Sequence, residues 1–298
     1  MKPVLEESKQ TRLGQGFYDS HRLQPEAIAN TAEAVARFAK IAREKQASKV
    51  RVIATSAARD AVNGQELTGA IKKASGLEVE IISGEQEADW VFRGVTSDPA
   101  LARDGEPLLL LDLGGGSAEF IVGQGQQKLF AESFPLGTVR MLERCAHGDP
   151  PQPQELEDCR SFVRDFIRTK VKPKVQPALE QAAAKKSAVE EGRSKRSARL
   201  IATGGTATIL ARMEGRLEDF DRDKIEATMI NASRLRWHVR NLWSLPLEQR
   251  KNVVGLPKNR ADVILTGAVI YEAVLEVFAF EEMRVSTRGL RFAAVIDA

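Results

Sequence analysis

The sequence of 298 residues is poor in the residue types that build disulfide frameworks and soft metal sites. It contains two cysteines, Cys145 and Cys159, too few for a disulfide scaffold or for a metal site made of thiolates. Its three histidines, His21, His147 and His238, lie far apart in the sequence, which argues against a histidine-rich zinc site. We therefore expect a protein of a reducing compartment, namely the cytoplasm.

Long apolar runs are also missing. No run reaches the roughly 18 to 20 residues that a membrane-spanning helix needs, and the first residues carry no apolar core of the kind found in signal peptides. The 44 lysines and arginines nearly balance the 41 aspartates and glutamates, which leaves a net charge of +3. Because 43% of the residues are hydrophobic, a chain of this length can form two packed domains, and we expect no membrane partner.

Aromatic residues make up only 6% of the chain, and their distribution weakens a nucleic-acid interpretation. Two basic stretches, residues 170–174 and 185–199, could follow a polyanion, but neither contains an aromatic side chain on which a base could stack. A solvated helix face explains them better. We therefore expect no specific nucleic-acid partner.

Strands and helices alternate in the first third of the chain, which is typical of βαβ units on a mostly parallel sheet. The periodicity of apolar residues predicts helices at 25–45, 65–75 and 85–94, and strands at 49–55 and 77–82. The polar segment 97–106 follows. We place the domain boundary there, which gives domains 1–104 and 105–298.

The second part begins with three strands in close succession, which predicts an antiparallel meander. These strands are expected at 108–113, 118–122 and 128–134, and a helix at 138–145 follows them. The remaining pattern predicts helices at 154–170, 175–190 and 261–278, strands at 200–203 and 284–286, further helices between them, and a closing helix.

The strongest chemical signal is the turn between the first two strands of the meander, where residues 111–119 read Leu-Asp-Leu-Gly-Gly-Gly-Ser-Ala-Glu. Glycines let backbone N–H groups approach an oxyanion without a Cβ in the way, so we interpret Gly114, Gly115, Gly116 and Ser117 as a phosphate loop. Asp112 and Glu119 flank it, and two carboxylates beside phosphates suit Mg²⁺. The alternative is an ordinary glycine hairpin with a solvated aspartate.

A second junction of strand, glycines and helix occurs at Gly204, Gly205 and Thr206. The N-terminus of a helix attracts anions through its unpaired N–H groups. Close packing of the strand against the helix explains these glycines equally well, so the junction alone does not establish a ligand contact.

Two further candidates lie in the first third. Glu87 begins a helix together with Glu85 and Asp89, which we interpret as surface residues, and it is a candidate general base if it points toward the glycine loop. Arg59 follows the end of a strand, where open α/β sheets bind ligands. It could hold a phosphate there or pair with the neighbouring Asp60.

Five short motifs occur in an order and spacing that resemble one protein family. They are residues 82–88 (Ile-Ser-Gly-Glu-Gln-Glu-Ala), 112–119, 134–137 (Phe-Pro-Leu-Gly), 203–206 (Thr-Gly-Gly-Thr) and 260–262 (Arg-Ala-Asp). Together they resemble the exopolyphosphatase and guanosine pentaphosphate phosphohydrolase (Ppx/GppA) family, from about residue 5 to residue 290.

The resemblance implies an α/β fold of the actin-like ATPase superfamily, in which two ribonuclease-H-like domains with mixed sheets and flanking helices surround a cleft. It implies release of the terminal phosphate of inorganic polyphosphate, or of the 5′ phosphate of guanosine pentaphosphate (pppGpp), with Mg²⁺ or Mn²⁺. Glu87 would activate water, and Asp112 and Glu119 would bind the metal ion. Substrate phosphate would be held by Arg59, Gly114, Gly115, Gly116, Ser117, Gly204, Gly205 and Thr206. Homodimers are common in the family.

The beginning of the chain departs from that pattern, because family members open with a strand and an Asp-x-Gly-Ser/Thr-Asn-Ser loop. Glu7-Ser8 followed by Leu13-Gly14 echoes Glu132-Ser133 followed by Leu136-Gly137, as in a duplicated half. Asp112 precedes Glu132 by 20 positions, so its counterpart would lie at position −13. Either the start codon is misassigned, or this first phosphate loop is absent and the activity of the chain as written is in doubt.

Two other functions stay open from the sequence. A non-catalytic protein that binds the alarmone or polyphosphate would be compatible with an absent first loop and a retained glycine cradle. A phosphotransferase of the same superfamily would share the architecture, but the motif at residues 83–88 argues against it.

Overall fold

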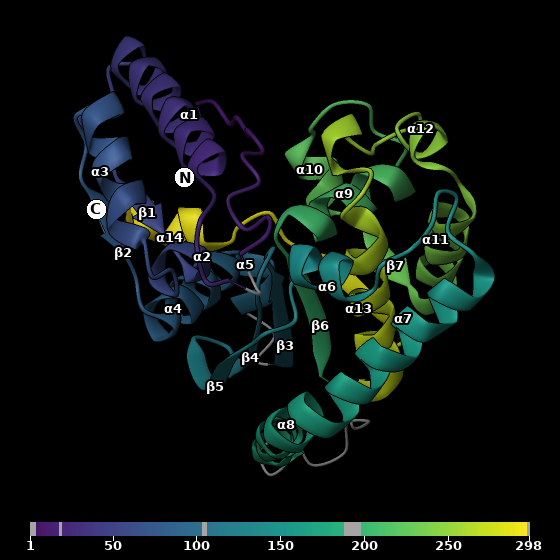
Figure 1. Cartoon of the computed structure of the whole chain (residues 1–298). Helices are drawn as coiled ribbons and strands as arrows, with labels where there is room; N and C mark the ends of the chain where they lie inside the picture. Colours follow the sequence, from purple (N-terminus) through teal and green to yellow (C-terminus); the bar gives the residue numbers. More distant parts are fainter. Residues whose placement is uncertain (1–3, 18–19, 103–105, 188–197, 297–298) are drawn as a thin grey trace. The chain divides into compact units, whose positions relative to one another are not determined.

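The computed structural model describes residues 4–17, 20–102, 106–187 and 198–296. The chain divides into two units, Met1–Ser83 and Gly84–Ala298, each of which combines helices with its own β-sheet (Figure 1). Most of the basic stretch 185–199 and the last residues of the helix expected at 175–190 lie outside the described residues.

The first unit packs two long helices beside a parallel pair of strands. Its elements are α1 (Pro25–Glu44), β1 (Val52–Ala54), α2 (Ser56–Arg59), α3 (Gly64–Ser75) and β2 (Val79–Ile81). Strands β1 and β2 pair in register, with Val52 opposite Val79. Both are shorter than the strands expected at 49–55 and 77–82, and Ile81 keeps 42% of its side chain exposed.

The core of the first unit follows from helical spacing. Ile28 and Ala32 lie one turn apart on α1 and are buried, as are Leu67 and Ile71 on α3. The loop that precedes α1 is fixed by the buried Asn63, whose amide both accepts a hydrogen bond from the backbone N–H of Leu23 and donates one to its carbonyl (2.9 and 3.0 Å). A buried amide needs such partners, since an unpaired one costs free energy.

The second unit is built around a six-stranded mixed sheet with the strand order β5-β4-β3-β6-β8-β7. Its strands are β3 (Pro107–Leu113), β4 (Ala118–Gln124), β5 (Gln127–Phe134), β6 (Arg199–Thr203), β7 (Met229–Asn231) and β8 (Glu282–Val285). The first three form the expected antiparallel meander, while β6 pairs parallel with both β3 and β8. The helices of this unit are α4 (Gly84–Thr96), α5 (Pro99–Ala102), α6 (Thr138–Arg144), α7 (Pro153–Phe166), α8 (Lys172–Ser187), α9 (Gly205–Glu214), α10 (Arg222–Glu226), α11 (Ala232–Ser244), α12 (Leu247–Arg250), α13 (Ile264–Phe278) and α14 (Leu290–Ile296).

Strand β3 lies in the middle of this sheet because both of its faces are apolar. Leu108 and Leu110 belong to one hydrophobic cluster, and Leu109 and Leu111 belong to another on the opposite face. All four side chains are fully buried. A strand buried on both faces reads as a continuous apolar run, which is why the sequence predicts it well.

Helix α4 covers one face of this sheet and therefore belongs to the second unit. Its residues Val91, Phe92 and Val95 pack in the same cluster as Leu108 and Leu110 of β3. The two units consequently divide after Ser83, whereas the sequence led us to expect the boundary near residue 104. The polar segment that contains α5 therefore lies within the second unit, since the apolar face of α4 is buried against the sheet that follows it.

Several other elements differ from the sequence expectation. The helices expected at 154–170 and 175–190 are joined by a π-helical segment, Ile167–Val171. Strand β7 was not predicted. Residues 5–10, which include Glu7 and Ser8 of the segment that echoes Glu132-Ser133, form no strand. In the part of the chain that the structure describes, no helix combines the length and apolar character that crossing a membrane requires.

Replacing Gly94 of α4 with alanine should destabilise the second unit. A Cβ at this position would lie 2.6 Å from the carbonyl oxygen of Arg288 and closer still to that of Gly289, so α4 would have to move away from the segment before α14. We expect Gly94→Ala to lower the free energy of unfolding by about 2 kcal/mol, measured by urea denaturation followed by circular dichroism.

The matched control is Gly69→Ala on α3, where no atom lies within 4 Å of the added Cβ. Alanine is the better helix former, so this change should raise the stability of its unit by about 0.5–1 kcal/mol. Equal effects of the two substitutions would contradict the tight contact at Gly94.

Candidate active site

Three acidic side chains meet at one end of the second unit's sheet, and we call them the carboxylate cluster: Glu87, Asp112 and Glu119. Asp112 lies near the end of β3 and pairs directly with Glu119 of β4 across the antiparallel ladder. Directly opposed residues of neighbouring strands point to the same face, with Cβ atoms about 4.5–5.5 Å apart. Glu87 comes from the first turn of α4 and is 7% exposed.

Burial and mutual repulsion raise the pKa values of two of these groups. Burial is the larger cause for Asp112, and the charge of Glu87 adds to it, so that its pKa rises to about 7. For Glu119, burial followed by the charges of Asp112 and Glu87 raises the pKa to about 8. The charge of Glu87 acts on both other carboxyl groups, so Glu87 lies within electrostatic reach of them.

The neighbours on α4 behave as surface residues. Glu85 is exposed, and Asp89 forms an ion pair with Lys128 of β5 at 2.9 Å. Glu87 is thus the acidic residue of this first turn that is buried, which confirms the sequence interpretation of Glu85 and Asp89 as surface residues.

Two hydroxyl groups orient Glu119. The side chains of Ser117 and Ser133 each donate a hydrogen bond to its Oε1 atom at 2.8 Å. These bonds lower the pKa of Glu119 and partly offset the effect of burial. The sequence suggested Ser117 as a phosphate ligand, and in the structure its hydroxyl binds Glu119. A contact of Ser117 with phosphate stays a prediction. Ser133 was not singled out from the sequence.

The glycine turn between β3 and β4 is held by the first turn of α6. Three consecutive carbonyl groups accept hydrogen bonds from this helix: Gly114 O from Thr138 N (3.0 Å), Gly115 O from Val139 N (2.8 Å) and Gly116 O from Arg140 Nε (2.9 Å). A Cβ on Gly137 would overlap the Gly115 carbonyl group, so the helix can approach this closely only with glycine there.

This arrangement determines the direction of the loop's N–H groups. In a planar trans peptide the C=O and the following N–H point in opposite directions. Because the carbonyls of Gly114, Gly115 and Gly116 face α6, the N–H groups of Gly115, Gly116 and Ser117 point away from it. Successive N–H groups on one side of a turn form a concavity that suits an anion.

The second glycine junction lies directly beside Asp112. Gly204 has φ +92°, and a Cβ there would lie 2.7 Å from Asp112 Oδ1 and 3.0 Å from the carbonyl oxygen of Leu113. Only glycine fits this position. Gly205 opens α9, and a Cβ added to it would have no atom within 4 Å, whereas the Thr206 side chain packs against α13 at Gly267. Close packing therefore accounts for Gly204 and Thr206, and Gly205 borders open space.

Tyr271 of α13 is a neighbour of the cluster that the sequence analysis missed. It is fully buried, and its hydroxyl donates a hydrogen bond to the carbonyl oxygen of Thr203 at 2.9 Å. Burial and then the charge of Asp112 raise the pKa of this phenol, which places it near the carboxylate. The available signal was a tyrosine hydroxyl in a mostly apolar helix, where a buried polar group needs a partner.

Arg59 belongs to the first unit, where it contacts its own surroundings. Its Nη1 atom donates to the carbonyl oxygen of Ile82 at 3.0 Å, and its Nε atom lies 3.6 Å from Asp60 Oδ1. The pairing with Asp60 was one of the two alternatives raised by the sequence. A role of Arg59 in holding phosphate stays a prediction.

The donor set at the carboxylate cluster fits a magnesium ion. Within the described ranges, no group of three or more histidine, cysteine, aspartate or glutamate side chains is arranged to hold a metal ion by itself. Mg²⁺ needs no such cage, since it typically takes one or two carboxylates and completes its shell with water and substrate phosphates. Asp112 and Glu119 supply two carboxylates whose mutual repulsion a cation would relieve.

Comparison with known proteins now identifies the family. A model of the Ppx/GppA phosphatase family matches residues 1–297. The chain belongs to this family. It is 32% identical over 274 residues to exopolyphosphatase 2 of Mycobacterium tuberculosis, covering 90% of the chain and 79% of that protein. It is 24% identical over 294 residues to exopolyphosphatase 1 of Mycobacterium bovis, covering 99% of the chain and 80% of that protein.

Solved structures of the Ppx/GppA family confirm the expected α/β fold of the actin-like ATPase type. An exopolyphosphatase-like protein matches with a TM-score of 0.82 at 26% identity and covers 100% of this chain and 92% of its own. An exopolyphosphatase from Cytophaga hutchinsonii has a TM-score of 0.80 at 26% identity, covering 98% and 88%. The Aquifex aeolicus family member has a TM-score of 0.73 at 26% identity, covering 99% and 88%.

The stability of the metal-free second unit should fall as the pH rises from 5 to 8. Asp112 and Glu119 bind protons with pKa values of about 7 and 8 when folded but near 4 when unfolded, so their stabilising contribution is complete below pH 4 and is lost as the pH passes the folded values. Each group should contribute a loss of up to about 3 kcal/mol, measured by urea unfolding in EDTA.

In the Asp112→Asn variant this pH dependence should become shallower, and added Mg²⁺ should stabilise the wild-type protein above pH 7 more than the variant. An unchanged slope in the variant would show that the carboxylate cluster does not set the pH dependence.

Substitutions at the two neighbouring glycines should separate packing from ligand contact. Gly204→Ala would bring a methyl group against Asp112 at positive φ, so we expect a loss of about 1–3 kcal/mol in stability. Gly205→Ala meets no protein atom, so the melting temperature should stay unchanged while the KM for a phosphate substrate rises. Wild-type KM in Gly205→Ala would remove this residue from the binding site.

Proposed function

We propose that this protein is a phosphohydrolase that releases terminal phosphate from inorganic polyphosphate. The proposal rests on one observation above all: a buried carboxylate cluster beside a glycine turn whose N–H groups point away from the helix that holds it. Relatives named exopolyphosphatase, one of them 32% identical over 90% of the chain, support polyphosphate as the substrate class.

The proposed roles follow from the chemistry of the groups. Asp112 and Glu119 hold the divalent cation, Mg²⁺ or Mn²⁺, which when bound neutralises charge on the transferred phosphate. The N–H groups of Gly115 and Gly116 bind phosphate oxygens. Glu87 accepts a proton from water as the water oxygen bonds to the terminal phosphorus and the bridging P–O bond breaks, with the shortened chain leaving as the anion.

Guanosine pentaphosphate is the second substrate that we propose to test, because its 5′ end carries the same terminal phosphoanhydride bond. Support comes from the Ppx/GppA family match over residues 1–297. Orthophosphate release from tripolyphosphate, long-chain polyphosphate and pppGpp, each with Mg²⁺, would establish which of them the enzyme prefers. Binding of one of these ligands without any release of phosphate would favour a regulatory binding protein instead.

Replacing the proposed base gives the sharpest test. Glu87→Gln keeps the size and hydrogen-bonding capacity of the side chain but removes its basicity. We expect the rate of phosphate release from polyphosphate to fall by about 10²–10⁴-fold, with binding retained, measured by orthophosphate detection and by calorimetry.

Glu85→Gln is the matched control, since Glu85 lies on the same turn of α4 but is exposed. Its rate should match that of the wild-type protein. Wild-type activity in Glu87→Gln would refute the assigned base without affecting the identity of the substrate.

A further inference from the structure

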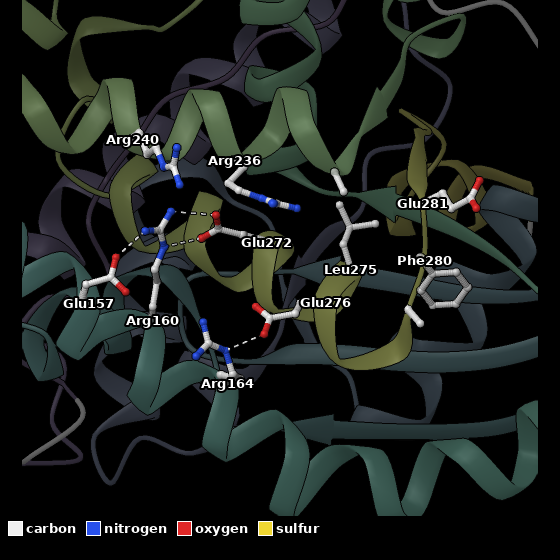
Figure 2. A pocket seen from close by; sticks show the side chains of 12 residues that line it. Glu157, Arg160, Arg164, Arg236, Arg240, Glu272, Leu275, Glu276, Phe280 and Glu281 are labelled. Atoms are coloured by element: carbon white, nitrogen blue, oxygen red, sulfur yellow. Dashed lines mark hydrogen bonds and ion pairs between the residues drawn. The ribbon is translucent and has the colours of Figure 1, made fainter.

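A groove of about 660 Å³ lies between α7, α11 and α13 of the second unit and shares no residue with the carboxylate cluster. Four arginines line it: Arg160 and Arg164 from α7, and Arg236 and Arg240 from α11. Figure 2 shows the Arg236 and Arg240 side chains extending from α11 toward the floor of the groove. The proposed reaction uses none of these four residues.

The arginines of α7 are already neutralised by the groove's own carboxylates. Arg160 forms two hydrogen bonds of 2.8 Å to Glu272 and one of 2.6 Å to Glu157. The Arg160 and Glu272 side chains are only 11% and 12% exposed, which makes this a largely buried pair. Arg164 pairs with Glu276 at 3.0 Å. Two arginines thus face three glutamates, so the floor of the groove leaves no unpaired positive charge.

The arginines of α11 are different. Arg236 and Arg240 are exposed, and within the described residues neither forms a hydrogen bond or an ion pair. They lie four residues apart on one helix, so their Cβ atoms are about 6 Å apart and both guanidinium groups reach the same space. Glu281 is the remaining carboxylate of the wall, and Figure 2 shows it at the far end, directed away from Arg236.

We propose that this arginine groove binds a segment of condensed phosphate, held by Arg236 and Arg240. Guanidinium groups match phosphate oxygens in a bidentate geometry, and such charge-assisted bonds are stronger than neutral ones. A condensed phosphate carries charge on consecutive units and brings several charges into a small volume. An acidic peptide spreads its carboxylates along a longer backbone and must also place its amide groups.

The proposal deepens the proposed function, because it assigns a second contact for a polyphosphate chain on the same unit. Helix α13 connects the two places: Tyr271 contacts Thr203 beside the carboxylate cluster, and the next residue, Glu272, belongs to the floor of the groove. The groove would therefore act as an accessory phosphate site that raises affinity without taking part in the chemistry.

Arginine footprinting tests the site directly on the intact wild-type protein. The chain is treated with phenylglyoxal in EDTA, so that hydrolysis does not interfere, and modified peptides are quantified by mass spectrometry. Tripolyphosphate should slow the modification of Arg236 and Arg240 several-fold and leave the exposed Arg216, outside the groove, unchanged. Absence of protection would overturn the proposal, whether or not the enzyme releases phosphate from polyphosphate with Mg²⁺.

Two further ligands test which chemical class of anion the groove binds. Orthophosphate at the same phosphorus concentration should protect much less than tripolyphosphate, and equal protection would overturn the assignment to a condensed chain. Poly-glutamate should also protect less, and stronger protection by it would assign the groove to an acidic protein segment instead.

Calorimetry with variants measures the contribution of the two guanidinium groups. Arg236→Gln combined with Arg240→Gln should weaken tripolyphosphate binding by at least about tenfold, and lysine at both positions should restore only part of the affinity, because it keeps the charge but loses the bidentate geometry. The control combines Arg216→Gln with Lys170→Gln, which removes the same charge from exposed positions outside the groove. Equal losses in the two double variants would overturn the proposal in favour of a general charge effect.

Discussion

Two carboxyl groups that face each other across neighbouring strands, with little solvent around them, constrain the structure of the second unit. Asp112 and Glu119 occupy directly paired positions of β3 and β4, and Glu87 adds a third negative charge from α4. Such a cluster opposes folding at neutral pH unless protons or a cation neutralise it. The cluster therefore lowers the free energy of unfolding of the second unit at neutral pH. The burial of the β3 leucines offsets this loss.

The surroundings of the cluster follow from the need to bring several backbone segments close to it. Glycine at position 204 lets the β6–α9 junction touch Asp112, and glycine at 137 lets α6 bind the carbonyls of the glycine turn. Ser117 and Ser133 then fix the orientation of Glu119. Each of these residues acts on the geometry of a carboxylate or of a loop N–H group. The rigidity of the site thus comes from the sheet and from α6.

Local patterns made much of this predictable from the sequence. The apolar run of β3, the glycine turn and the return strand β4 are adjacent in the chain, so Asp112 and Glu119 could be expected on one face. The short edge strand β7 could not be predicted, because its three residues form a strand only by pairing with β8, which lies more than fifty positions away in the sequence. The two compact units divide after Ser83 and not near residue 104 for a similar reason, since the partner of the apolar face of α4 lies beyond the polar segment that suggested the boundary.

Ser133 and Tyr271 are the two residues of the site that the sequence did not predict. Neither belongs to one of the five motifs. Ser133 reaches Glu119 across the β4–β5 hairpin, whereas Tyr271 reaches Thr203 of β6 from α13, an element 68 positions further along the chain. Spacing along the chain cannot reveal the Tyr271 contact, but a buried hydroxyl can at least be marked as needing a partner.

The charges of the carboxylate cluster and of Arg236 and Arg240 in the arginine groove, two places that α13 connects, have opposite signs. The carboxylate cluster repels a polyanion when its groups are ionised, and a bound cation would relieve that repulsion. The arginine groove attracts a polyanion without any metal ion, because Arg236 and Arg240 are not paired with the carboxylates of the floor. A polyphosphate chain would therefore bind at the groove under conditions in which it is excluded from the cluster. A chelator would weaken binding at the carboxylate cluster but not at the arginine groove. For a polyphosphate chain long enough to use both contacts, removal of the metal ion would therefore reduce hydrolysis more than binding.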